Sequence, residues 1–112
     1  MPNRDRQSIE DMLRAARKIL EYAVGTNRET LPAIPMRLDA LLYEMIVFGE
    51  AARRLSQELR EHHSDVPWRD IIGMRNVVTH GYDQIDDEEL WQVIDRDLPG
   101  LISKLENIMT TL

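Results

Sequence analysis

The chain has 112 residues, of which 43% are hydrophobic and 30% charged, and this predicts one soluble domain (residues 1–112) with a single modest core. No apolar run is long enough for a membrane span, and the polar N-terminus lacks the apolar segment of a signal peptide, so we expect a cytoplasmic protein. The absence of cysteine excludes disulfides, thiol catalysis and cysteine-ligated zinc.

The formal net charge of −6 is concentrated in one segment. Residues 83–97 carry seven acidic residues and one basic residue, whereas residues 1–82 carry equal numbers of each sign. This balance argues against broad, salt-driven binding to nucleic acid, although arginines elsewhere could still hold a phosphate. The acidic segment is either the solvated start of a helix or a docking surface for a basic partner, and both interpretations stay open.

Apolar residues at helical spacing predict a first helix over residues 5–24, which ends at Gly25. The following segment, TNRETLPAIP, contains two prolines and predicts a loop. A second apolar stripe predicts one helix over residues 36–62. Gly49 lies in its interior, and the small residues GEAA there predict a close helix–helix contact, within the chain or between two chains.

A third helix is expected over residues 66–80, with Ser64 or Asp65 as its cap, and a fourth over residues 87–110. Asp86 is placed to cap the fourth helix, and Pro99 should kink it. No strand-like alternation is present. The predicted fold is therefore all-α: a four-helix up-down bundle with a kinked, long C-terminal helix.

The segment GMRNVVTHGY, at the end of the third predicted helix, combines Arg75, Asn76, His80 and Tyr82. A cation is favoured at a helix C-terminus, which suits a protonated His80. Asn76 shares the face of His80, while Arg75 lies about 140° away around a regular helix, so that Arg75 and His80 would flank a groove.

This combination suggests phosphodiester chemistry, since an imidazole can transfer protons near neutral pH and a guanidinium can stabilise a phosphate. In RNA the attacking group can be the substrate's own 2′-OH, without a metal ion. A symmetric dimer would bring two copies of His80 together as acid and base. The alternative is structural: Arg75 pairs with an acid such as Asp70, and His80 only caps the helix.

The residues Arg75–Tyr82 (RNVVTHGY) match the R-x4-H-x-Y pattern of the HepT-like toxins, a branch of the HEPN superfamily. IVFGEAARRL (46–55) is similar to the family's IGEAAKRL, apart from Phe48 at a position where Ile is commoner. VPWRDIIG (66–73) is similar to its PWREIIG, and LWQVIDRDL (90–98) with Pro99 to its W-x-I…DLP. The resemblance covers about residues 8–109, in order.

The resemblance implies a metal-independent endoribonuclease without cofactors that acts as a toxin and forms a homodimer. It implies that Arg75 and His80 are the catalytic pair, facing their copies across a cleft, and that Asn76 positions the phosphate or His80. It also implies a partner, a minimal nucleotidyltransferase antitoxin that transfers AMP to Tyr82. An adenylate there would block RNA by its charge and its bulk.

Two other hypotheses remain: a non-catalytic HEPN module that binds a nucleotide or holds the substrate of a nucleotidyltransferase, and a helical dimer with only an interaction role. His62 and His63 are interpreted as helix caps rather than metal ligands. Arg53 and Arg54 fit a solvated face better than phosphate contacts. Other aromatic residues are expected to be structural, with two in the core: Trp68 and Trp91.

Overall fold

A computed structural model describes the backbone of residues 2–79 and 86–112, and the side chains of residues 4–74 and 86–112. Every element in these ranges is helical, which confirms the predicted all-α class. The elements are α1 (Pro2–Ala23), α2 (Pro35–Arg53), α3 (Gln57–His62), α4 (Trp68–Thr79), α5 (Asp87–Gln92), the π-helical turn η2 (Val93–Asp97) and α6 (Leu98–Thr110). Within the described ranges, no helix combines the length and apolar character needed to cross a membrane.

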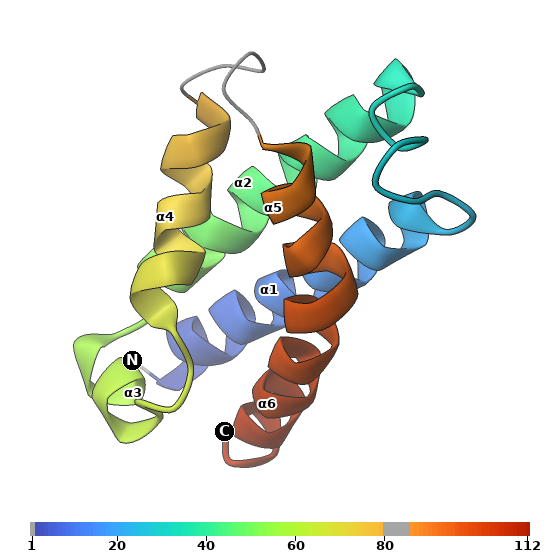
Figure 1. Cartoon of the computed structure of the whole chain (residues 1–112). Coiled ribbons are helices and arrows are strands. Elements are labelled where there is room, and N and C mark those ends of the chain that lie inside the picture. The colour runs from blue at the N-terminus through green and yellow to red at the C-terminus, as the bar shows by residue number, and fades with distance from the viewer. Residues whose placement is uncertain (1, 80–85) are drawn as a thin grey trace.

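The helices form a bundle around one apolar core. Helix α1 packs against α2 and α6, and α2 also packs against α4. Figure 1 shows α4 and α5 on the same side of the molecule, with the end of α4 and the start of α5 at one end and α3 near the other. The core includes fully buried side chains from several helices: Ile9, Met12, Ile19, Leu41, Phe48, Ile71, Leu98 and Leu105.

The helix predicted over residues 36–62 is two helices, α2 and α3, because the chain turns at Ser56. The Ser56 side chain caps α3 by accepting a hydrogen bond from the Leu59 backbone N–H at 3.2 Å. Ser56 in turn donates from its backbone N–H and its hydroxyl to the buried carboxylate of Asp5, at 2.9 and 2.6 Å. The prediction of one helix was wrong because Leu55 and Leu59 are both buried and continue the apolar period across the break.

The small residues of α2 pack inside the chain. Gly49 and Ala51 are buried, and Ala52 is fully buried, so the predicted close contact is satisfied within the monomer. Trp68 is 7% exposed and donates from Nε1 to the carbonyl of His63 at 3.0 Å, while Trp91 packs against the core only in part. The core assignment of Trp68 is thus confirmed.

Helix α4 begins at Trp68, two residues later than predicted, and neither of the predicted caps is used. The Ile71 N–H donates to the Pro67 carbonyl, so the helix starts directly after Pro67. Asp65 instead lies 3.8 Å from the Lys104 ammonium of α6. The Asp86 cap is confirmed, since its carboxylate accepts hydrogen bonds from the backbone N–H groups of Glu88 and Glu89 at 2.9 and 3.3 Å.

A kink was expected at Pro99. The structure has the π-helical turn η2 there, which ends two residues before the proline. The Leu98 N–H donates to the Val93 carbonyl, an i to i+5 bond that inserts one extra residue into the turn. Proline has no N–H and its ring crowds the carbonyl four residues earlier, so the wider turn accommodates Pro99 at the start of α6.

Candidate functional site

The catalytic motif predicted from the sequence begins on α4. The backbone of Arg75 and Asn76 belongs to the second half of this helix. Their side chains, together with His80 and Tyr82, lie outside the described residues. The structure therefore shows that α4 carries Arg75 and Asn76. That the four motif side chains lie close together stays a prediction.

The position of α4 is fixed by its buried face. Ile71 is fully buried and Trp68 nearly so, and α4 packs against α2. By helical register, position 75 lies one turn beyond Ile71, and position 76 lies two turns beyond Arg69, about 10 Å along the axis. Positions 75 and 76 therefore differ by about 100° around α4. The prediction that Arg75 and His80 flank a groove stays a prediction, because His80 lies outside the described residues.

Glu50 of α2 is an acidic residue next to this framework that the sequence analysis did not single out. Its Oε1 atom is shielded from solvent, and the Arg53 guanidinium lies 3.7 Å from it. The neighbours Gly49 and Ala51 are buried. The signal in the sequence was a carboxylate between two small residues within the apolar stripe of this helix. Carboxylates avoid such a position unless they are paired.

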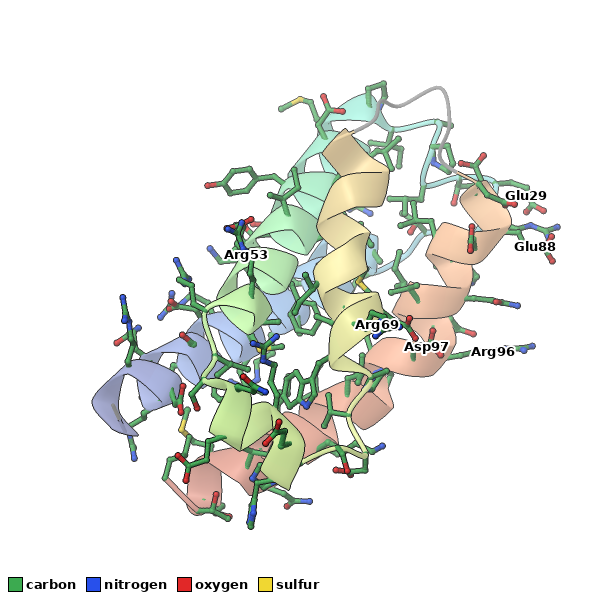
Figure 2. The ribbon with its side chains drawn as sticks, turned by 90° about the vertical axis from the view of Figure 1, so that its left-hand side faces the viewer. Glu29, Arg53, Arg69, Glu88, Arg96 and Asp97 are labelled. Carbon is green, nitrogen blue, oxygen red and sulfur yellow. The ribbon has the colours of Figure 1, made fainter. Side chains whose placement is uncertain are left out.

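A groove of about 400 Å³ separates α4 from α5 and η2, with α2 beneath it. Its apolar lining includes Leu42 and Met45 of α2, which are 2% and 5% exposed. Its polar lining consists of one guanidinium and four carboxylates: Arg69, Asp70, Asp86, Glu89 and Asp97. Figure 2 shows Arg69 of α4 and Asp97 of η2 at this side of the molecule.

The exposed arginines differ in their partners. Arg53 and Arg54 are solvated, as predicted, and pair with Glu50 and with Asp11 at 3.7 and 3.4 Å. Arg69 and Arg96 are also exposed, and neither forms an ion pair within the part of the chain that the structure describes. Arg69 is therefore a charged group at the groove that is available to a ligand.

His62 and His63 end α3, as predicted, and their rings meet edge to face at 5.0 Å. They precede the start of α4, and Arg75, the first motif position on that helix, lies about 10 Å beyond its start along the axis. Among the described residues, no group of three or more His, Asp or Glu side chains is placed to hold a metal ion. These histidines are thus separated from the first position of the predicted motif by about half of α4.

Residues 12–108 match the family model HepT-like, which is described as "Ribonuclease HepT-like". The relatives include "Putative RNase TTE0752" of Caldanaerobacter subterraneus subsp. tengcongensis, which is 30% identical over 93% of both chains. "Putative RNase MJ1380" of Methanocaldococcus jannaschii is 28% identical over 88% of this chain and 90% of its own. "Probable ribonuclease HepT" of Thermococcus cleftensis is 26% identical over 89% of this chain and 91% of its own.

No solved structure matches the chain significantly. The family model nevertheless spans α1 from Met12, the whole of α2, α3 and α4, and the C-terminal helices as far as Ile108. The match includes both the backbone that carries Arg75 and Asn76 and the segment that contains His80 and Tyr82. The chain therefore belongs to the HepT-like ribonuclease family, a family of RNA-cleaving enzymes.

Proposed function

We propose that this chain is a metal-independent endoribonuclease that acts as a toxin in the cytoplasm, with Arg75 and His80 as its catalytic pair. The observation that carries the proposal is the R-x4-H sequence motif, whose Arg75 belongs to a helix anchored by buried residues, in a chain of the HepT-like ribonuclease family. Asn76, on the same helix, would position the phosphate or His80.

The reaction needs only the substrate and these side chains. A histidine takes the proton of the ribose 2′-OH, whose oxygen attacks the adjacent phosphorus. The bond from phosphorus to the 5′-oxygen breaks, the leaving oxygen gains a proton from a protonated histidine, and a 2′,3′-cyclic phosphate remains. The Arg75 guanidinium stabilises the negative charge that grows on the phosphate oxygens, through bidentate hydrogen bonds.

One histidine in each chain supplies either the acid or the base, so the proposal includes a homodimer with a composite site. The exposed face of α2 supports this part of the proposal. Met36 and Tyr43, two turns apart on α2, are 85% and 62% exposed, and Val47, one turn beyond Tyr43, is partly buried against the core. Large apolar side chains exposed on one face of a helix offer a surface that a partner can cover.

The proposal also includes control by a nucleotidyltransferase antitoxin that transfers AMP to Tyr82. Tyr82 follows the motif histidine by two residues, so an adenylate there would add a phosphate and a bulky base beside the catalytic pair. The phosphate would repel the RNA backbone, and the base would occupy its path.

The test is cleavage of purified total RNA in EDTA by the wild type, by His80→Ala and by Arg75→Ala, after intact mass has shown Tyr82 to be unmodified. We expect cleavage by the wild type alone, with 2′,3′-cyclic phosphate ends. If unmodified wild type leaves the RNA intact, the chain is instead a non-catalytic nucleotide-binding or substrate-holding subunit. Equal cleavage by all three proteins would identify a contaminating nuclease.

A further inference from the structure

The groove between α4 and α5–η2 contains a glycine that the fold itself does not require. Gly73 lies in the interior of α4, where glycine costs about 1 kcal/mol relative to alanine. Its φ is not positive, so no special backbone conformation demands it. A Cβ atom added at Gly73 would meet no described atom within 4 Å.

A helical glycine with space over it that no described atom fills can accept a group from another molecule. Gly73 lines the groove next to Met74, and Met45 lies in the same lining. Methionine side chains are flexible and adapt to varied apolar partners. The glycine and the two methionines together form an apolar floor onto which another backbone or an aliphatic side chain can pack closely.

The rim of this floor is acidic. Asp70, Asp86, Glu89 and Asp97 contribute four carboxylates to the groove lining, against the single guanidinium of Arg69. All four acidic residues are exposed. Such a rim attracts cationic side chains and repels the phosphates of RNA, so charge favours a basic polypeptide over a nucleic acid as the occupant.

We infer that this groove, defined by Gly73, Met45, Met74, Glu89 and Asp97, is a docking site for a basic, amphipathic segment of a partner protein. An aliphatic side chain of that segment packs over Gly73, and flanking lysine or arginine side chains pair with the carboxylates of the rim. The inference does not depend on RNA cleavage.

The test uses a fluorescein-labelled twelve-residue peptide of alternating leucine and lysine pairs, with fluorescence anisotropy as the readout. A second peptide of equal charge, with glycine in place of every leucine, measures attraction by charge alone. We expect the leucine peptide to bind the wild type at least about tenfold more tightly than the glycine peptide, because a buried aliphatic anchor supplies most of the affinity. Affinity should fall as salt screens the carboxylates.

Two pairs of variants locate the binding. Gly73→Leu fills the groove, and Gly100→Leu is its control, because Gly100 also lies in a helix where an added Cβ would meet no described atom within 4 Å. The charge variant is Glu89→Gln with Asp97→Asn. Its control is Glu88→Gln with Asp95→Asn, which removes the same charges from neighbouring exposed positions that do not line the groove.

We expect each groove variant to bind the leucine peptide at least about tenfold more weakly than its control, with both controls within about twofold of the wild type. Circular dichroism would establish folding, and the charge pair still tests the inference if Gly73→Leu fails to fold. No binding to the wild type, or equal effects of groove and control variants, would overturn the inference. The inference would also be overturned if Gly73→Leu weakened the binding of a labelled single-stranded RNA but not the binding of the leucine peptide.

Discussion

The turn between α2 and α3 and the groove beside α4 differ in how their polar groups are satisfied. At the turn, the buried Asp5 carboxylate accepts two hydrogen bonds from Ser56, and Ser56 caps α3. At the groove, Arg69 and four carboxylates are exposed around an apolar floor with free space above Gly73. The first region has its polar groups satisfied within the chain. At the second, Asp86 caps α5, while Arg69, Asp70, Glu89 and Asp97 are exposed groups that a partner can satisfy.

This difference separates residues that hold the fold from residues that act on other molecules. A change at the turn should lower the free energy of unfolding without altering the chemistry of the folded protein. A change at the motif or the groove should instead alter cleavage or binding, and should change the free energy of unfolding less than a change at the turn does. Five measurements test that separation, from the largest expected effect to the smallest.

The largest effect is expected at the catalytic pair, which the proposal assigns to Arg75 and His80. Replacing His80 by alanine should lower the rate of RNA cleavage roughly 100- to 10,000-fold, because a positioned acid–base group contributes about that much. The melting temperature should stay close to that of the wild type. A large loss of stability in His80→Ala would place the residue with the structural group instead.

The second effect concerns the exposed face of α2. Tyr43→Arg should weaken the proposed homodimer about tenfold or more, because an aromatic anchor is replaced by a charge at the interface. Analytical ultracentrifugation over a range of concentrations measures the dimer dissociation constant. Exposed Arg53 offers a control on the same helix, since Arg53→Ala removes a charge that already pairs within the chain. Equal dissociation constants for all three proteins would contradict a dimer that uses this face.

The third effect concerns the turn. Asp5→Ala should lower the free energy of unfolding by about 2 kcal/mol, because the Ser56 N–H and hydroxyl lose their acceptor. Urea denaturation of Asp5→Ala, Ser56→Ala and the double variant measures the coupling between the two side chains. Because they form direct hydrogen bonds, we expect a coupling of about 0.5–3 kcal/mol. Strict additivity of the two single changes would mean that this contact does not stabilise the fold.

The fourth effect is at the start of α5. Asp86→Ala removes the carboxylate that caps the Glu88 and Glu89 N–H groups, and should cost about 1 kcal/mol of stability. Asp86→Asn keeps an acceptor oxygen and should recover most of that loss. Thermal denaturation of the three proteins is sufficient, and equal losses in both variants would show that charge rather than capping matters here.

The smallest effect has the opposite sign. Gly73→Ala should raise the free energy of unfolding by up to about 1 kcal/mol, since alanine favours the helix and its Cβ has free space. Gly100→Ala provides the comparison at a second open helical position. Destabilisation by Gly73→Ala would mean that the glycine serves the fold, and would remove one support for the docking site.

Much of the fold follows from local patterns that the sequence displays. The apolar periods predicted the bundle and most helix positions, and Asp86 indicated the start of α5 because a capping carboxylate acts on its own neighbours. The prediction of one helix over residues 36–62 was wrong because the break in this helix depends on a contact between residues far apart in the chain. Its interruption depends on Asp5, which lies 51 residues from Ser56 and contributes to the turn only once α1 has packed nearby.

The sequence by itself determined the all-helical class, the charge imbalance and the R-x4-H-x-Y motif, since each depends on residue type and spacing along the chain. Only the tertiary structure decided where α2 ends, and which acidic residues line a groove with Gly73. The physical reason is that helical periodicity specifies which face of a helix is buried, but not what lies opposite the exposed one. That juxtaposition arises when α4 packs on α2 and η2 packs on α1.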